Sequence, residues 1–444
     1  MTAQPVIPGP KGHFALGNMD AFNKDTLNFL LQLRQYGDVA RFRFGPFPLL
    51  VVNDPDVARD VLVTHADQYY KNSLTKEIMA PAIGNGLFVS DGDFWKHQRK
   101  LIQPAFHSKR ISAYGQIMSH YAADLGETWR DGEARAIDHD MTALTMRIIA
   151  KTLFDSDIAH ETPEVGRVIR EVLALIEESF RALVPTPYWI PTPHNRKMRE
   201  AMKRLSAVID GFIVERRASG EDKGDFLSLL LTAQDEESQI MTDAQVRNEA
   251  MTLFGAGHET TAVTLMWAWY LLSQNPEVET RLHDELSHVL AGRLPTVEDL
   301  PGLPYLEMVF KETMRLYPAA YIISRDANET VNLNGYTVKK GQTLFINVFG
   351  IHRDERFYAD PDRFDPERFS AENEKKLPKY AYIPFGGGPR VCIGNSFSLM
   401  EARLLLATLA QRYSLSVAPG FKVVPERQFT LRPKFGLQMV IKAR

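Results

Sequence analysis

The sequence predicts a mainly α-helical protein with a minor β-sheet region. Helical periodicity dominates residues 93–290, and strand-like alternation is confined to short stretches before residue 60 and after residue 318. The composition is that of an ordinary globular protein, with 44% hydrophobic and 24% charged residues. We expect a single domain over residues 1–444, in which a β-rich N-terminal part, about residues 1–60, packs on a helical body.

Charge and cysteine content exclude several classes of protein. The formal net charge is −3 and the basic residues are spread along the chain, which argues against a nucleic-acid partner. The single cysteine, Cys392, excludes intramolecular disulfides and multi-cysteine metal clusters. The N-terminus lacks the pattern of a signal peptide, and the longest apolar run, Ala262–Leu272, is too short to span a bilayer. We therefore expect a cytoplasmic protein without a membrane anchor.

The first predicted elements are two short strands and a helix. In Val39–Phe44, phenylalanines alternate with arginines, and Leu49–Val52 continues after two prolines as a second strand. Asp54 is a suitable helix N-cap, and Pro55 suits the first helical position. These patterns predict a hairpin followed by a helix.

The central region is predicted to be helical. A capping box, Thr242–Gln245, begins a long apolar-periodic helix that runs to about Leu272. Asn275 and Pro276 begin the next helix. Between earlier helices, the segment Val184–Pro193 is rich in Pro, Tyr and Trp and is predicted to be a loop.

Strand-like patterns return in the last third of the chain. Residues 330–347 alternate around an Asn334-Gly335 hairpin turn. An irregular segment, residues 353–369, precedes a glycine-rich loop and a helix over about residues 395–413. The tail, residues 421–442, is predicted to form strands.

The strongest chemical signal is the decapeptide Phe385–Gly394, which contains three consecutive glycines and Cys392. A lone cysteine is most often a small buried hydrophobe. Here, however, glycines let the backbone approach a flat ligand, and the start of the following helix favours an anion. A thiolate in that place would suit axial ligation of haem iron, with Arg390 pairing with a propionate. A phosphate-binding loop would require Gly-Lys-Ser/Thr at the helix start, and the sequence has Cys-Ile-Gly-Asn instead.

This decapeptide resembles the cysteine-ligand loop of the cytochromes P450 at every defining position. The resemblance implies the cytochrome P450 fold, haem b (iron protoporphyrin IX) as the cofactor, and Cys392 as the axial haem iron ligand. It extends over essentially the whole chain, and the family's other motifs occur in the family's order.

The stretch Ala256–Thr261 lies midway along the long central helix. Gly257 in this stretch and Gly255 just before it each destabilise a helix by roughly 1 kcal/mol relative to alanine. A threonine hydroxyl that bonds back to the backbone can bend a helix. The result would be a groove for dioxygen, with Glu259 and Thr260 as an acid–alcohol pair that relays protons. The stretch resembles the family's distal-helix motif, in which any residue is allowed at His258, and we assign His258 no role.

A second resemblance concerns an ion network. Alone, Glu312 and Arg315 would be an ordinary solvated pair on a helix. They resemble the family's Glu-x-x-Arg pair, and Arg368 lies in a segment that resembles the one completing a Glu–Arg–Arg network. The resemblance implies a structural role, in which the network holds the loop below the haem.

Further cations are implied to bind the haem propionates. Trp95 and Arg99 lie four residues apart on one face of a predicted helix, where the simpler interpretation is a surface helix with a half-buried Trp. The family places a propionate-binding pair here and another propionate-binding residue at Arg325. With Arg390, these residues would neutralise the two carboxylates.

The resemblance also indicates substrate-contacting residues, although each of them would equally suit ordinary core. Collectively they are apolar, so we expect a lipophilic substrate of the fatty acid, terpenoid or carotenoid type. These residues are Phe88, Phe254, Ala256, Ala319, Ala320, Tyr321, Ile322 and Phe435.

The combined interpretation is a haem-thiolate monooxygenase that inserts one atom of dioxygen into an apolar small molecule. The chain has no cysteine cluster and no room for a fused flavin reductase, so electrons would come from a separate ferredoxin or flavodoxin with its reductase. Solvated surface is the simpler interpretation for each basic residue that would contact this partner. The candidates are Lys96, Lys100, Lys379 and Arg403.

Two alternative functions share the haem-binding signal. A peroxide-driven peroxygenase of the same fold would carry an Arg-Pro pair where this chain has Glu259 and Thr260. A non-catalytic haem-binding gas sensor would need no proton relay. Consumption of NAD(P)H coupled to product formation, with a surrogate reductase, distinguishes the monooxygenase from both.

Overall fold

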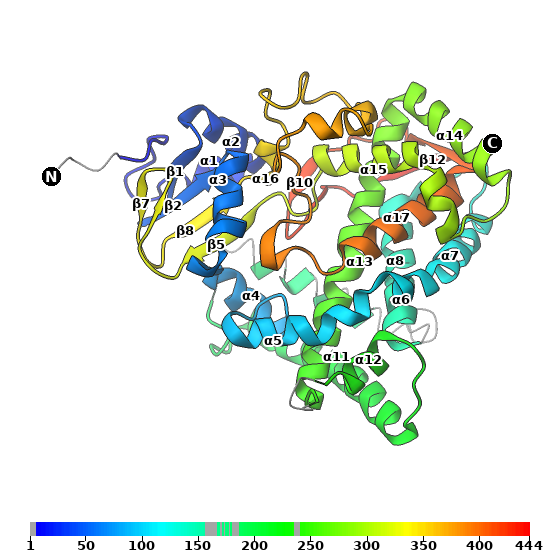
Figure 1. Cartoon of the computed structure of the whole chain (residues 1–444), viewed down its shortest axis with the longest axis horizontal. Coiled ribbons are helices and arrows are strands. Elements are labelled where there is room, and N and C mark those ends of the chain that lie inside the picture. The colour runs from blue at the N-terminus through cyan, green and yellow to red at the C-terminus, as the bar shows by residue number, and fades with distance from the viewer. Residues whose placement is uncertain are drawn as a thin grey trace. The chain divides into compact units, whose positions relative to one another are not determined.

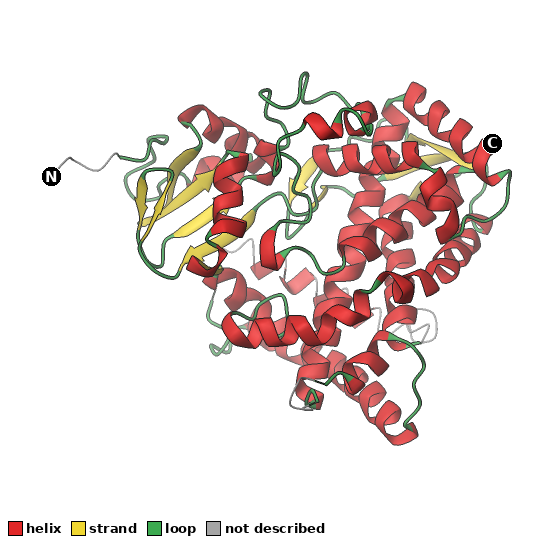
Figure 2. Ribbon diagram, viewed as in Figure 1, coloured by secondary structure: helices red, strands yellow, loops and turns green. Residues whose placement is uncertain are grey.

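The computed structural model describes residues 6–155, 167–168, 171–172, 174–176, 178–179, 186–234 and 240–444. It is mainly helical with small sheets, as the sequence predicts (Figure 2). The chain divides into two compact units, which are described separately. The prediction of a single domain stays a prediction. The first unit comprises Met1–Asn72, Tyr305–Ile393 and Pro425–Arg432, and the second comprises Ser73–Pro304, Gly394–Val424 and Pro433–Arg444.

The first unit is built on a mixed sheet with the strand order β1-β2-β8-β5-β3 (Figure 1). Strands β2 and β8 are parallel, and the other neighbours are antiparallel. Two ribbons pair β6 with β7 and β10 with β11. The strands are β1 (Val39–Phe44), β2 (Phe47–Val52), β3 (Tyr69–Lys71), β5 (Ile323–Ala327), β6 (Val331–Leu333), β7 (Tyr336–Val338), β8 (Thr343–Ile346), β10 (Pro425–Arg427) and β11 (Leu431–Pro433). The helices are α1 (Met19–Lys24), α2 (Thr26–Leu33), α3 (Pro55–Arg59), α15 (Pro304–Leu316) and α16 (Val348–Ile351).

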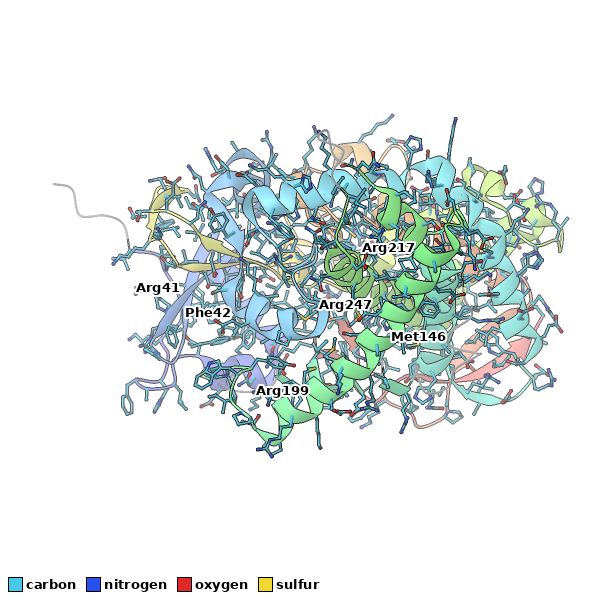
Figure 3. The ribbon with its side chains drawn as sticks, turned by 90° about the horizontal axis from the view of Figure 1, so that it is seen from below. Arg41, Phe42, Met146, Arg199, Arg217 and Arg247 are labelled. Atoms are coloured by element: carbon cyan, nitrogen blue, oxygen red, sulfur yellow. The ribbon has the colours of Figure 1, made fainter. Side chains whose placement is uncertain are left out.

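The predicted hairpin forms because its side chains alternate between core and solvent. Phe42 is buried, whereas Arg41, its neighbour on β1, is exposed (Figure 3). The ring of Phe42 packs edge-on against Phe29 of α2, with 5.5 Å between the centroids. Helix α2 was not predicted; its N-cap is Asp25, whose carboxylate accepts a hydrogen bond from a backbone N–H in the first turn.

Two local predictions in this unit are confirmed. At the start of α3, the side chain of Asp54 accepts hydrogen bonds from the N–H groups of Asp56 at 2.9 Å and Val57 at 3.2 Å. Asn334 and Gly335 join β6 to β7 with φ angles of 50° and 80°. Positive φ at both central residues is the mark of the type I′ turn that Asn-Gly favours.

The second unit is a helical body with a three-stranded antiparallel sheet of order β4-β12-β9. Its longest described helix, α13, begins at the predicted capping box, in which Thr242 and Gln245 bond reciprocally. The strands are β4 (Ala134–Ala136), β9 (Tyr413–Val417) and β12 (Gln438–Ala443). The helices are α4 (Ser73–Ile83), α5 (Gly92–Ile102), α6 (Ser108–Ala113), α7 (Gly115–Glu127), α8 (Ile137–Phe154), α11 (Pro193–Ser219), α12 (Phe226–Thr232), α13 (Asp243–Gln274), α14 (Pro276–Leu290) and α17 (Asn395–Ala410).

Helix α13 is held by apolar packing on one neighbour and by ion pairs on another. A Cβ at Gly257 would lie 2.9 Å from Cδ1 of Ile149 on α8, so glycine there permits the close approach of the two helices. Helical bonding continues through this glycine. On another side, Arg217 of α11 lies 2.6 Å from Asp243, and Arg247 lies 2.7 Å from Asp210 of α11 (both arginines are labelled in Figure 3).

The described part of the predicted loop at residues 184–193 is confirmed: residues 186–192 are irregular, and α11 begins at Pro193. Residues 184 and 185 lie outside the described residues. Among the helices that the structure describes, none is long and apolar enough to cross a membrane.

Candidate functional site

Cys392 lies at the end of a glycine-rich loop in the first unit. The loop turns through Gly386 and Gly388, whose φ angles of 73° and 66° are rarely adopted by L residues. The N–H of Cys392 donates to the carbonyl of Phe385 at 3.0 Å. The cysteine itself is exposed, although cysteine is among the residue types most often buried. The loop therefore presents the thiol instead of burying it.

Close contacts with other backbone and side chains fix this loop. A Cβ at Gly388 would lie 1.9 Å from the carbonyl oxygen of Leu62. A Cβ at Gly387 would lie 2.4 Å from the ring of Tyr380. Only glycine fits at Gly388, and a side chain at Gly387 would require the ring of Tyr380 to move, so the loop is closely packed on both sides.

The ion network predicted for the first unit is present as a set of contacts. The carboxylate of Glu312 accepts two hydrogen bonds from the guanidinium of Arg315, at 2.6 and 2.8 Å, and neither residue is exposed. Nε of Arg368 lies 3.4 Å from the same carboxylate. The N–H of Asp365 donates to it at 2.9 Å. The structure thus brings the three predicted residues together.

Arg315 also fixes the irregular segment that follows α16. Its Nη1 donates to the carbonyls of His352 at 2.8 Å and Pro361 at 2.7 Å, and its Nη2 donates to the carbonyl of Arg363 at 3.2 Å. Backbone carbonyls without secondary-structure partners are thereby satisfied by one buried side chain.

His352 continues this network toward the cysteine loop and was missed by sequence reasoning. The N–H of Ile383 donates to Nε2 of His352 at 2.9 Å, and Nδ1 lies 3.3 Å from the carbonyl of Arg315. Burial, aided by the charge of Arg315, lowers the pKa of His352 to about 3, so the ring is neutral. A lone histidine has no spacing pattern that would have revealed this link.

The residues of the first unit suit a flat ligand with carboxylates and one metal. Ile323 lies 3.4 Å from the place of a Cβ at Gly386, so this face of β5 lies against the loop. Arg325, two residues along the strand, shares that face and is 6% exposed. Arg390 is half-buried two residues before Cys392. An exposed thiol, a bare glycine backbone and cations form the donor set that an iron porphyrin bound through sulfur requires.

In the second unit, the middle of α13 presents small and hydroxyl side chains. Ala256 is exposed within an otherwise largely buried helix. The hydroxyl of Thr260 donates to the carbonyl of Ala256 at 3.0 Å, which is the predicted back-bond. Glu259 is half-buried beside it. His258 is fully buried, with Nδ1 2.8 Å from the carbonyl of Phe254, and burial lowers its pKa.

Trp95 and Arg99 lie on α5, as predicted. Trp95 is buried and Arg99 is half-buried. Phe88 is half-buried in the loop before α5. The four predicted propionate residues therefore belong to two units, with Trp95 and Arg99 in one and Arg325 and Arg390 in the other.

An apolar cavity of about 50 Å³ lies within the second unit. Phe254 is the predicted pocket residue that lines it. Its other walls come from α4, α8, α11 and α13, and include Ala82, Ile83, Phe154, Leu205 and Met251. Such a lining suits an apolar molecule or fragment.

The other predicted pocket residues are spread over both units. Tyr321 and Ile322 pack against the core cluster of the first unit, and the hydroxyl of Tyr321 donates to the carbonyl of Gln428 at 3.2 Å. Ala319 is half-buried and Ala320 exposed in the same segment. Phe435 is 62% exposed in the second unit.

Two buried carboxyls in the second unit were also missed. Glu249 accepts a hydrogen bond from the N–H of Leu87 at 2.9 Å, and burial raises its pKa to about 7. Burial raises the pKa of Glu401 on α17 to about 8, and the nearby Thr261 hydroxyl opposes that rise only in part. Neither glutamate differs, in the sequence, from a solvated helix residue.

The chain is similar to known proteins over nearly its whole length. A family model described as Cytochrome P450 matches residues 7–439. The chain is 38% identical over 432 residues to cyclooctatin synthase of Streptomyces melanosporofaciens, covering 96% of this chain and 93% of that protein. It is 36% identical over 410 residues to cyclooctat-9-en-7-ol 5-monooxygenase of the same organism, covering 91% and 88%. It is 30% identical over 446 residues to pentalenene oxygenase of Streptomyces avermitilis, covering 100% and 97%.

Proposed function

This chain belongs to the cytochrome P450 family, and on that premise we propose that it oxygenates a terpenoid, with Cys392 as the axial thiolate ligand of its haem. Membership of this family establishes the class of enzyme and its cofactor. The chain is a monooxygenase, its cofactor is haem b bound through a cysteine thiolate, and the family uses dioxygen and a redox partner.

The observation that carries the proposal for Cys392 is an exposed thiol on a loop whose glycines lie in close contact with Leu62 and Tyr380. When bound, the haem supplies the activation of dioxygen and the transfer of one oxygen atom to substrate. The Cys392 thiolate would supply the electron-donating sulfur ligand that this haem chemistry requires. Arg390, Arg325, Trp95 and Arg99 would hold the two propionates.

Thr260 and Glu259 are proposed to move protons. Conversion of a C–H bond and dioxygen into an alcohol and water consumes two electrons and two protons. The Thr260 hydroxyl donates to Ala256, so its acceptor lone pairs are left for a water. Glu259, the adjacent carboxyl, would resupply the proton that such a water passes on.

The Glu312–Arg315–Arg368 network is proposed to keep the cysteine loop in register. Its support is the chain of contacts from Glu312 through Arg315 to His352 and Ile383, just before the loop. The hydroxyl of Tyr358 adds a parallel bond to the carbonyl of Ala381 at 3.0 Å.

A terpenoid substrate is supported by two observations. The lining of the cavity in the second unit is apolar and includes Phe254 of the predicted pocket, which supports an apolar ligand, although about 50 Å³ holds only a small part of a terpenoid. Relatives with 30–38% identity carry the names of cyclooctatin, cyclooctat-9-en-7-ol and pentalenene. The other predicted pocket residues remain part of the proposal.

We further propose that electrons arrive from a ferredoxin or flavodoxin with its reductase. Lys96, Lys100 and Lys379 are exposed, which suits contacts with an acidic partner. Arg403 is half-buried and its Nε donates to the carbonyl of Leu399 at 3.1 Å, so it is the weaker candidate.

The test compares the purified protein with Cys392→Ser after incubation with hemin. The dithionite-reduced, carbon monoxide-treated parent should show the red-shifted Soret band of a thiolate ligand, and the serine variant should lack it. A parent without the band, or a variant that keeps it, would refute the assignment of Cys392.

Turnover is tested with a surrogate ferredoxin and reductase, NADPH, ¹⁸O₂ and a panel of terpenes. The expected result is a product with one labelled oxygen atom and NADPH consumption coupled to it. Product formed from peroxide alone, with none from any electron donor, would identify a peroxygenase. Haem binding without product from any terpene would refute the proposed substrate class.

A further inference from the structure

The loop that carries Phe88 packs against one turn of α13, residues 248–252, which we call the loop seat. The N–H of Leu87 donates to Oε2 of Glu249 at 2.9 Å. Glu249 is 1% exposed and Leu87 7%, so this bond is shielded from water. A shielded bond to a carboxylate holds a backbone more firmly than the same bond at the surface.

The two glycines of the loop fit the same turn. A Cβ at Gly84 would lie 2.1 Å from Oδ1 of Asn248, and a Cβ at Gly86 would lie 2.1 Å from Oγ1 of Thr252. Asn248, Glu249 and Thr252 lie within about one turn of α13, and all three face the loop. Any side chain at Gly86 would also meet the backbone carbonyl of Asn248, at 2.7 Å.

Burial of the Glu249 carboxyl group is unfavourable, because it removes an ionisable group from water. Burial raises the pKa of Glu249 to about 7, and the bond from Leu87 opposes the rise. An apolar side chain would be buried at no such cost. Within the described part of the chain, the N–H of Leu87 is the hydrogen-bond partner of this carboxyl, which links its burial to the position of the loop.

We infer that Glu249 is a positioning residue: it holds the loop of residues 84–90 against α13 and so places Phe88 for substrate binding. The inference deepens the proposed function and rests on it, because Phe88 is a proposed substrate contact. Glu249 acts through the backbone of Leu87 and need not touch the substrate itself.

The first test measures amide hydrogen exchange in the substrate-free holoenzyme for Glu249→Leu and Glu249→Gln. Leucine fills the space without an acceptor, so exchange across residues 84–90 should accelerate roughly ten-fold or more, which corresponds to about 1.4 kcal/mol. Glutamine keeps an acceptor oxygen, so its exchange should stay near that of the parent. This rescue would not occur if the position needed only a charge.

Two further variants separate docking of the loop from general stability. Gly86→Ala leaves Glu249 intact but adds a methyl group against Thr252, so it should accelerate exchange in the same segment. Combined with Glu249→Leu, it should add little, because both changes release one seat. Leu272→Ala, near the far end of α13, should lower the melting temperature without a selective change in residues 84–90.

The second test titrates each variant with the terpene that gives the parent its largest Soret shift. Glu249→Leu and Gly86→Ala should raise the dissociation constant for this terpene about ten-fold. Glu249→Gln and Leu272→Ala should leave it unchanged. Unchanged exchange in Glu249→Leu would overturn the inference, and so would accelerated exchange with unchanged affinity. If no terpene shifts the parent's band, the proposed substrate class fails, whereas the exchange comparison still decides whether Glu249 holds the loop.

Discussion

The hydroxyl proton of Thr260 is already used in a hydrogen bond to the carbonyl of Ala256. Its donor bond to Ala256 leaves its acceptor side for a water, and alanine would remove both functions. We therefore expect Thr260→Ala to keep the thiolate-type carbonyl spectrum while losing about ten- to a hundred-fold in product formed per NADPH consumed. Thr260→Ser should recover most of this loss. Full coupling in Thr260→Ala would contradict the proposed proton transfer.

Glu312 presents a different case, because its role is structural. Removing one partner of a buried, hydrogen-bonded pair leaves an uncompensated charge, which typically costs about 3–5 kcal/mol. Glu312→Leu strands Arg315 in this way, and its free energy of unfolding in urea should fall by about that amount. The matched control is Lys376→Ala, which breaks an exposed pair with Glu372 and should change stability by less than about 1 kcal/mol. Equal losses in both variants would refute a special role for the network.

At the scale of elements, the backbone of the cysteine loop is open to a controlled test. Gly388 and Gly341 both lie in the first unit with positive φ, at 66° and 77°. A Cβ at Gly388 would strike the carbonyl of Leu62, whereas a Cβ at Gly341 would meet nothing within 4 Å. Gly341→Ala should cost only the strain of a left-handed residue, roughly 1–2 kcal/mol. Gly388→Ala should in addition displace the loop, which haem content and the carbonyl spectrum would report as a loss of thiolate-bound haem.

Elements with local signals were predicted well. The capping box at Thr242, the N-cap at Asp54 and the Asn334-Gly335 turn each satisfy backbone groups within a few residues, so their chemistry is readable from the chain. Helix α2 was missed although Asp25 is a local N-cap, and its packing against Phe42 of β1 is a tertiary contact that the sequence does not show. The order β1-β2-β8-β5-β3 was also beyond prediction, since its pairings join distant segments.

The candidate site divides in the same way. Motif residues such as Cys392, Thr260 and Glu312 were identified from a resemblance, because their residue types and spacing are specific. His352, Glu249 and Glu401 were not, because a buried histidine or glutamate has the same sequence neighbours as an exposed one. Only tertiary packing distinguishes them, and their shifted pKa values are its consequence.

At the scale of the whole molecule, buried carboxyls should make stability depend on pH. Glu401 has a pKa near 4.5 when exposed and about 8 when folded, so the folded state retains a proton that the unfolded state releases. Its contribution is complete below about pH 4.5 and is lost as the pH rises through 8. Between pH 5 and 8, the parent should therefore lose on the order of a few kcal/mol relative to Glu401→Gln, which cannot ionise.

Urea unfolding of both holoenzymes at three pH values across that range would measure this difference. Glu249 contributes with the same sign, so Glu249→Gln should show a smaller version of the same effect. Identical pH profiles for parent and Glu401→Gln would show that the carboxyl is already ionised in the fold.

The sheet of the first unit affects how the protein folds during its synthesis on the ribosome. Strand β2 is complete at Val52, but its parallel neighbour β8 ends at Ile346. Beside them, the side-chain N–H of Asn347 donates a hydrogen bond to Oδ1 of Asn53, 294 residues earlier in the chain. At typical ribosome speeds of about 5–20 residues per second, roughly 15–60 s separate the synthesis of these two strands. Throughout that interval the edge of β2 in the nascent hairpin is unpaired and hydrophobic, and such an edge promotes aggregation. Slower translation or a shortage of chaperones should therefore lower the yield of soluble, folded protein.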